Sequence, residues 1–391
     1  MNRRPARTPA MLLATLLSTL VATLALLAAC TPGAPATLDL DGSWIVEWDG
    51  GAPSPDFATT GAMTLDVDVD GARYVGLDEA SGTKRCVDLD VRVLAGALVA
   101  LEAPSPFEDT PDVWAFLATR VDADTVRLTN DAEVLTLRRR TGAPPVADCA
   151  SATIALIAEL PVVAARSMKL QAVGSTLYLN TGEDGVPIVG VEAATGAITS
   201  TRTLTDAVGF GTVEPYLFAA ESGDRFFGTC RCGRSDRFTH FDLALDDALA
   251  QVDTEATGAH LSIRYGYFDA AGPALVVGGT GLEDGASVAP NRLVTFDPTT
   301  FAVLGTRDVL PGVWIDDVAT VEGQLLALIG EGARFGDVAV IGADGRADET
   351  YALQNAFEGY ARGIAGVGDV LYVVTEDYET DRVLLYAIEL D

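Results

Sequence analysis

A pattern that recurs about every 45–55 residues in the second half of the chain restricts the fold more than any other feature. Each copy has two apolar, β-like runs around a short turn, as in residues 186–204 and 291–309. Further copies cover 236–252, 336–353 and 381–391, and the last stops before its second run. A unit of this size cannot bury its apolar face alone, so the copies are expected to stack on one another. The pattern predicts the blades of a β-propeller.

A further β-like run precedes each copy and gives every repeat a third strand. These runs are 174–182, 224–233, 273–281, 323–332 and 368–377. The run that the last copy lacks has a candidate at 152–161, and a blade completed in this way closes the ring. We predict an all-β protein whose second domain, residues 150–391, is a five-bladed propeller with terminal strand closure. A degenerate blade hidden in 205–220 or 253–270 would change this count by one.

Residues 38–145 show a shorter β pattern. The stretch TGAMTLDVDVDGARYVGLDE (60–79) alternates apolar and polar residues and turns at Asp70-Gly71, which is typical of a hairpin with one buried face. Closure of a sheet removes its exposed edges, so consecutive short strands here predict a small up-and-down barrel. Its eight strands are expected at 43–48, 60–69, 73–78, 84–93, 97–102, 112–120, 124–129 and 133–140.

Two sequence features of this region resemble lipocalins. Gly42-Ser43-Trp44 matches the G-x-W of the first lipocalin strand, and LTLRRR (135–140) ends the last strand with three arginines. The resemblance implies a lipocalin-like barrel in which one of them, Arg138, packs across Trp44 and closes the barrel floor. The interior is expected to be filled by side chains, and a hollow cup for a small ligand is the alternative.

The N-terminus carries an export signal. Arg3, Arg4 and Arg7 precede a long uncharged run, which makes residues 1–29 a signal peptide. Leu27-Ala28-Ala29-Cys30 resembles a bacterial lipobox, which implies cleavage before Cys30 and lipidation of its thiol. Thr31 follows Cys30, and in a Gram-negative cell this resembles lipoproteins of the outer membrane. Residues 30–37 then form a short tether. The alternative is an uncleaved anchor helix.

The chain is strongly acidic. Its formal charge of −30 becomes −33 once the three arginines of the signal peptide are removed. Such a charge repels phosphate backbones, so nucleic-acid binding is not expected. The same charge also repels anionic membrane surfaces, so the expected membrane attachment is the lipid anchor.

Four cysteines remain after Cys30, in a compartment where thiols tend to pair. We predict one disulfide between Cys86 and Cys149 and a tight second one between Cys230 and Cys232. The alternative for the second pair is a metal site that joins Cys230 and Cys232 with the only two histidines, His240 and His260. A single residue between two cysteines is short for chelation, and the spacing matches no known zinc pattern.

The propeller register predicts a binding face formed by two sets of loops. The loops after the second strands are acidic and could attract a calcium ion or a cationic partner, or could be solvated turns. Their acids are Glu183, Asp184, Glu283, Asp284, Glu331, Glu376, Asp377 and Glu379. The loops that lead into the innermost strands carry candidate ligand-binding residues, which could hold a carboxylate or phosphate or could pair with the loop acids. These are Arg166, Arg264, Asp317 and Arg362.

The sequence contains no hydrolase signature: there is no G-x-S-x-G, and neither histidine has an evident nucleophile partner. We therefore expect a non-enzymatic cell-envelope lipoprotein without a resident cofactor. Its propeller face would bind a protein or glycan partner, and its barrel would act as a spacer or small-ligand module. One alternative is a metal-dependent propeller hydrolase or lactonase that uses the acidic face. Another is a lipid carrier that uses the barrel.

Overall fold

The structure is a computed structural model, and the residues that it describes form only β-strands, turns and irregular segments. No helix among them is long and apolar enough to cross a membrane. The signal peptide, the lipobox and the tether lie outside the described part of the chain. The described residues are 38–48, 61–68, 71–94, 97–103, 112–130, 134–163, 168–181, 187–203, 218–230, 237–242, 247–253, 261–283, 286–331, 334–353, 356–377 and 380–390.

The first eight strands form a closed barrel in which each strand pairs with the next and β8 pairs with β1. The eight strands expected from the sequence are all present, and the predicted up-and-down order is confirmed. They are β1 (Gly42–Trp48), β2 (Met63–Asp68), β3 (Gly71–Leu77), β4 (Lys84–Leu94), β5 (Leu98–Ala103), β6 (Asp112–Arg120), β7 (Thr125–Thr129) and β8 (Val134–Arg139).

Large side chains fill the barrel. Trp44, Tyr74, Leu101, Phe116 and Leu128 come from different strands, are almost completely buried and belong to one apolar cluster. Burial of side chains this large contributes about 1.5–3 kcal/mol each before the entropy of ordering is subtracted. The interior is therefore a packed core in the described part of the barrel.

The arginine that closes the floor of the barrel is Arg139, not Arg138. Trp44 pairs with Arg139 across β1 and β8, and cross-strand partners point to the same side of a sheet. The Arg139 guanidinium carbon lies 4.6 Å from the centre of the Trp44 ring. Arg138 pairs with Ile45, points outward and binds Glu47 at 2.8 Å. The prediction of Arg138 was wrong by one residue, and one residue exchanges the two faces of a strand.

The remaining twenty strands form five four-stranded antiparallel sheets. The first sheet contains β10 (Lys169–Val173), β11 (Thr176–Asn180), β12 (Pro187–Glu192) and β13 (Ile198–Thr203). The second contains β14 (Phe218–Ala220), β15 (Arg225–Cys230), β16 (Arg237–Asp242) and β17 (Asp247–Asp253). The third contains β18 (Leu261–Asp269), β19 (Ala274–Glu283), β20 (Ala286–Phe296) and β21 (Val303–Val309).

The last two sheets complete the ring. The fourth contains β22 (Trp314–Val321), β23 (Gln324–Glu331), β24 (Arg334–Ile341) and β25 (Ala347–Tyr351). The fifth contains β26 (Tyr360–Val367), β27 (Val370–Asp377), β28 (Arg382–Leu390) and β9 (Ala152–Leu160). The pairing of β9 with β28 confirms the predicted terminal closure. The segments considered for a hidden blade instead supply innermost strands, β14 and β18.

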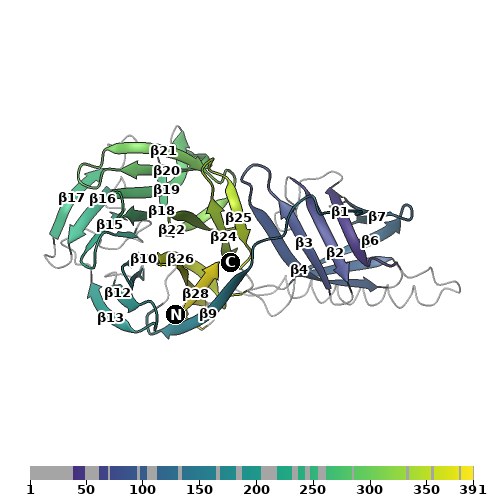
Figure 1. The fold of residues 1–391 in the computed structure, drawn as a ribbon, viewed down its shortest axis with the longest axis horizontal. Helices are drawn as coiled ribbons and strands as arrows, with labels where there is room; N and C mark the ends of the chain where they lie inside the picture. The colour runs from purple at the N-terminus through teal and green to yellow at the C-terminus, as the bar shows by residue number, and fades with distance from the viewer. Residues whose placement is uncertain are drawn as a thin grey trace, which may run out of the picture.

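The five sheets are blades arranged around an axis (Figure 1). Each innermost strand contacts the next one, from β10 through β14, β18, β22 and β26, and β26 contacts β10 again. The apolar core lies between neighbouring blades: one buried cluster joins the third and fourth, and another joins the fifth and first. The strands are held both by pairing within blades and by packing between them.

The barrel rests on the fourth blade through its β3–β4 loop. The Ala347 amide donates to the Ser81 carbonyl at 2.7 Å. The Lys84 ammonium lies 2.9 Å from the Glu349 carboxylate. Ala347 and Glu349 both belong to β25 of the propeller. Gly82 has φ +76°, and a Cβ there would lie 2.9 Å from the Ala347 carbonyl oxygen. The close contact between the two domains thus requires glycine at this position.

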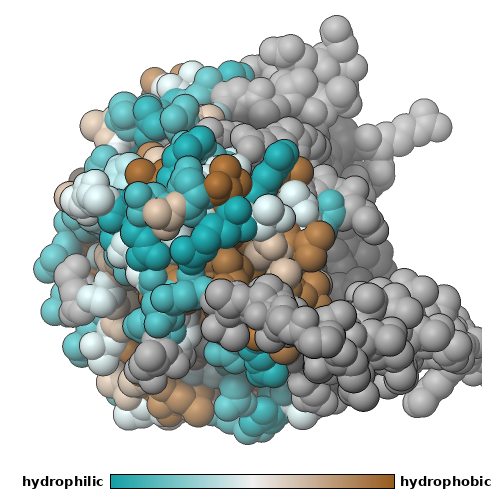
Figure 2. Space-filling view, turned by 90° about the vertical axis from the view of Figure 1, so that its right-hand side faces the viewer, coloured by the Kyte–Doolittle hydropathy of each residue, from teal (hydrophilic) through white to brown (hydrophobic). Residues whose placement is uncertain are grey.

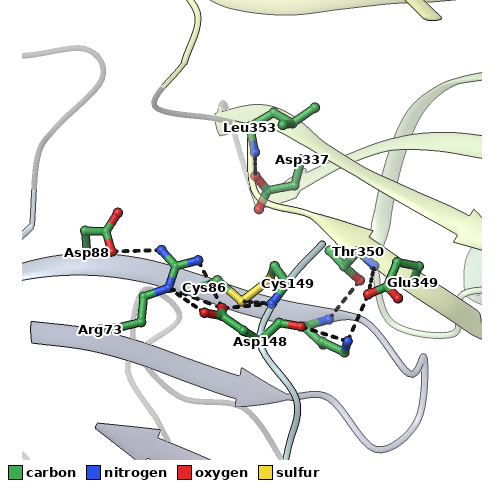
Figure 3. The surroundings of a disulfide bond; sticks show 10 residues. Arg73, Cys86, Asp88, Asp148, Cys149, Asp337, Glu349, Thr350 and Leu353 are labelled. Carbon is green, nitrogen blue, oxygen red and sulfur yellow. Dashed lines mark hydrogen bonds and ion pairs between the residues drawn. A yellow bond between two sulfur atoms is a disulfide. The ribbon is translucent and has the colours of Figure 1, made fainter. Parts of the chain in front are cut away.

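A disulfide between Cys86 and Cys149 fixes the chain that leads from the barrel to the propeller (Figure 3). The predicted pairing of these two cysteines is present in the structure. Cys86 lies in β4, and Cys149 directly precedes Ala150, which bridges to Tyr351 of β25. Arg73 binds Asp148 at 3.0 Å and adds a polar contact beside the disulfide. The connection is therefore attached to both domains.

Candidate functional site

Three innermost strands of the propeller share an irregularity near their first residues. The pairing of β18, β22 and β26 shifts by one residue at Arg264, Asp316 and Arg362, respectively. An extra residue of this kind re-aims neighbouring side chains and is often found beside functional sites. The three residues occupy equivalent positions around the axis.

The acid in this equivalent set is Asp316, the direct neighbour of Asp317, which the repeat register places only to within about two positions. Asp317 lies one residue farther along β22, level with Tyr265 of β18 and Gly363 of β26. The shift in pairing cannot be seen in the sequence, so the repeat alignment does not separate the two neighbouring aspartates. The fourth candidate, Arg166, lies outside the described residues.

Arg264 and Trp314 form a stacked pair between the third and fourth blades. The Arg264 guanidinium carbon lies 4.1 Å from the centre of the Trp314 ring, within the range of a cation–π contact. The Trp314 side chain is nevertheless 42% exposed. Arg264 Nε is buried, and no hydrogen-bond partner is present for it in the described structure. The pair therefore presents an exposed indole ring whose orientation is held by the stacked Arg264 guanidinium.

Arg362 is engaged by an acid from the neighbouring strand. Its Nε donates to Glu376 at 3.0 Å, and both side chains are almost completely buried. The guanidinium also lies 5.3 Å from the centre of the Tyr360 ring. Buried ion pairs are costly to break, because the remaining charge is left without compensation. Arg362 therefore adopts the alternative role, pairing with a loop acid.

A buried lysine reaches across the axis of the propeller. Lys169 begins β10 in the first blade, and its ammonium lies 3.6 Å from the carboxylate of Asp316 and donates to the carbonyl of the same residue in the fourth blade. Gln171 of β10 crosses in a similar way and donates to the Gly266 carbonyl of the third blade at 3.2 Å. These two side chains occupy the axis at their level. A ligand would accordingly bind on the face of the propeller and not within its channel.

Asp317 connects the fourth blade to the fifth. Its two carboxylate oxygens accept hydrogen bonds from the Val318 amide at 3.0 Å and the Ile364 amide at 3.1 Å. The side chain is fully buried, and burial raises the pKa of Asp317 to about 7 although nearby Lys169 and the amides act in the opposite direction. This residue joins two blades and is not open to a ligand.

The acidic loops lie only partly within the described structure. Glu376 binds Arg362, and Asp377 binds Arg382 at 3.2 Å. For Glu283 and Glu331 the structure describes the backbone alone. Glu183, Asp184, Asp284 and Glu379 lie outside the described residues, and the expectation of a calcium site there stays a prediction.

Of the cysteine and histidine candidates, the structure describes His240 and the backbone of Cys230, at different positions along the second blade. Cys230 is the last residue of β15, and Cys232 and His260 lie outside the described residues. The His240 ring stacks on Phe227 with centroids 4.1 Å apart. Its Nε2 lies 2.6 Å from a Glu221 oxygen, in the turn at the opposite end of β15 from Cys230. The described contacts of His240 are those of a packed side chain paired with an acid.

Sequence reasoning missed Trp314 and Lys169. Trp314 is the only tryptophan outside the barrel region, which was a compositional signal. Lys169 is one of only two lysines in the chain. Their partners come from other blades, so neither contact is visible in a local pattern.

No family model and no curated protein sequence matches the chain. Among solved structures, glutaminyl cyclase from Myxococcus xanthus is similar with a TM-score of 0.43 and 15% identity, over 62% of this chain and 100% of that chain. A luciferin-regenerating enzyme has a TM-score of 0.37 and 13% identity, over 61% and 95% of the two chains. BamB from Moraxella catarrhalis has a TM-score of 0.29 and 15% identity, over 88% of this chain and 99% of that chain. Likenesses this weak do not indicate what the chain binds.

Proposed function

We propose that this protein is a non-enzymatic lipoprotein of the bacterial outer membrane, anchored through Cys30. Its propeller face binds a protein or glycan partner around Trp314, and its barrel holds the propeller away from the membrane. No resident cofactor is part of this proposal.

The exposed indole of Trp314 beneath the Arg264 guanidinium is the observation that supports a binding face. Tryptophan and arginine are the side chains that most often supply binding energy at interfaces. An indole offers a flat apolar surface for a sugar ring or an apolar side chain. Because Arg264 is already stacked, a partner would lose little side-chain entropy in ordering it.

Two further observations favour binding over the alternatives. Glu376 and Asp377, which belong to the acidic loops, are engaged by arginines, and this favours a binding face over a metal-dependent hydrolase. The packed interior of the barrel favours a spacer over a lipid carrier. The disulfide and the β25 contacts would let such a spacer fix the direction of the propeller.

The binding proposal is tested with the emission of Trp314. Soluble disaccharide fragments of cell-wall peptidoglycan are titrated into the wild type and into Trp314→Phe. A glycan partner is expected to change the emission of the wild type only, and Arg264→Ala should weaken the binding.

A protein partner is tested in living cells with a photo-crosslinking amino acid at position 314. The matched control is Leu304, which is exposed on the outermost strand of the third blade. A discrete adduct at 314 but not at 304 supports the proposal. The absence of both a glycan response and a specific adduct contradicts it.

The anchor is tested separately by Cys30→Ser. Wild-type protein is expected in the membrane fraction with the mass of a lipidated cysteine, and the variant is expected to be released. A wild type that carries no lipid at Cys30 refutes the lipoprotein assignment, whatever the propeller binds.

A further inference from the structure

The barrel has two ends, and the propeller occupies one of them. The β3–β4 loop contacts β25 there, as described above. The opposite end contains the β4–β5 turn, the β6–β7 turn and the start of β1. Arg120 at the end of β6 donates to the Asp39 carbonyl at 3.2 Å, so the N-terminal segment reaches the barrel beside the β6–β7 turn. The chain thus joins the barrel at the end remote from the propeller.

Aliphatic side chains that are exposed or half-buried gather at this same end. Leu94, Leu98 and Leu117 pair directly across β4, β5 and β6, and cross-strand partners lie side by side on one face. Leu117 is 56% exposed and Val121, which follows β6, is 60% exposed. Val93, at the end of β4, is also exposed. Its register partner is the buried Val99, so Val93 lies on the inward face and does not belong to the leucine row. We call the four residues on the outward face, Leu94, Leu98, Leu117 and Val121, the distal rim.

Single exposed aliphatic residues are ordinary on protein surfaces, whereas a contiguous group indicates an interaction surface. Figure 2 views the molecule from the side of the barrel and shows hydrophobic surface interrupting the hydrophilic surface. The leucine row runs across three neighbouring strands, so it forms one continuous strip.

The tether limits what can lie opposite the distal rim. Leu38, where the described structure begins, lies eight positions along the chain from Cys30, and eight residue steps span at most about 26–29 Å. If Cys30 is lipidated, as proposed above, the end of the barrel that receives the chain is held within this distance of the bilayer. We propose that the distal rim contacts the lipid surface, and this inference rests on the anchor in the proposed function.

The contact is shallow. Asp122 follows Val121 directly and is fully exposed. Hydrogen bonds from the Asp124 amide and from Thr125 lower the pKa of Asp122, so its carboxylate remains charged. Because removing a charge from water is costly, this side chain must stay in the hydrated headgroup layer. The aliphatic side chains of the distal rim therefore reach the boundary of the acyl chains and no farther.

One strand provides a matched pair of positions for the test. Val113 and Leu117 lie on the same outward face of β6 and are 54% and 56% exposed. Four residues of a strand separate them by about 13 Å along the barrel. Leu117 belongs to the distal rim, whereas Val113 lies toward the propeller. An equal distance from the membrane is therefore not expected for the two positions.

The experiment uses the full-length lipidated chain carrying Cys230→Ser and Cys232→Ser, with Leu117→Cys or Val113→Cys as the labelled residue. Each variant receives an environment-sensitive fluorophore and is placed in vesicles of phosphatidylethanolamine with a minor share of phosphatidylglycerol. We expect a blue shift at position 117 and loss of its emission when nitroxide-labelled lipids are included, with little change at position 113. Val121→Cys is a second distal-rim position and should behave like 117.

Flotation of the same samples separates this inference from the anchor proposal. Protein that fails to float with the vesicles contradicts the anchor and with it the inference. Protein that floats while positions 117 and 121 emit as in water overturns the inference and leaves the anchor intact. Equal quenching at 113 and 117 also overturns it, because the barrel would then lie on its side.

Discussion

Removal of the Cys86–Cys149 disulfide should destabilise the barrel strongly. The bridge closes a loop of 63 residues that contains β5 to β8 and most of β4. The chain-entropy relation for a loop of this length gives about 14 cal/mol/K, or about 4 kcal/mol at 25 °C. Domains of this size are stable by about 5–15 kcal/mol, so the loss is a large fraction of the total. The double variant Cys86→Ser/Cys149→Ser is expected to remain folded but close to its limit.

Urea unfolding followed by tryptophan fluorescence measures this loss, because Trp44, Trp48 and Trp114 all lie in the barrel. The background is Trp314→Phe, so that the emission reports the barrel alone. With a slope of about 2 kcal/mol/M, the midpoint should fall by about 2 M. Cys230→Ser/Cys232→Ser is the control and should leave the barrel midpoint unchanged. A shift below about 0.5 M in the Cys86→Ser/Cys149→Ser variant would refute the loop-closure reasoning.

Three further predictions follow from single contacts. Arg139→Ala should lower the free energy of unfolding of the barrel by about 1 kcal/mol, because it removes the cation over Trp44. Arg138→Ala removes a solvated surface pair with Glu47 and should cost less than about 0.5 kcal/mol in the same urea titration. The raised pKa of Asp317 means that its contribution to stability is complete below pH 3.8 and is lost as the pH rises through about 7, so Asp317→Asn should flatten the pH dependence of propeller unfolding measured by circular dichroism across this window. Equal slopes for wild type and variant would contradict the assignment. Gly82→Ala should weaken the contact between barrel and propeller by more than about 1 kcal/mol. The 140–149 connection should then be cut faster by a protease. Unchanged cleavage would show that the strain at this glycine is relieved elsewhere.

The architecture could be predicted because both of its patterns are local. Alternation with a period of two fixes which face of each barrel strand is buried, and the repeat fixes the order of the blades. The completion of the last blade by 152–161 also followed from counting, since only one copy lacked its second run. Neither inference depends on the partner of any single side chain.

The site residues were harder to predict from the sequence, because their contacts depend on strand register and on partners in other blades and not on a local pattern. A one-residue difference separates Arg138 from Arg139 and Asp317 from Asp316, and only the strand register decides between neighbours. The bulge at Asp316 is a feature of pairing and leaves no mark in composition. Trp314 and Arg264 meet across two blades, so their stacking depends on the closed ring. Predictions that needed only the buried face, or a pair of cysteines, therefore succeeded, whereas the choice between neighbouring residues required the register.

The two lysines of the chain show how an acidic protein holds its parts together. Lys84 joins the barrel to Glu349 of the propeller and also donates to the Asp148 carbonyl, and Lys169 joins the first blade to Asp316 of the fourth. Both ammonium groups are largely buried, and each satisfies a carboxylate and a backbone carbonyl in another part of the fold. An ammonium has three donors and can serve both acceptors at once. In a chain with a net charge of −30, acidic surfaces that approach one another repel, and a buried cation at the junction offsets that repulsion where it would otherwise be strongest. The two lysines of this chain therefore lie at structural joints, one between barrel and propeller and one between two blades.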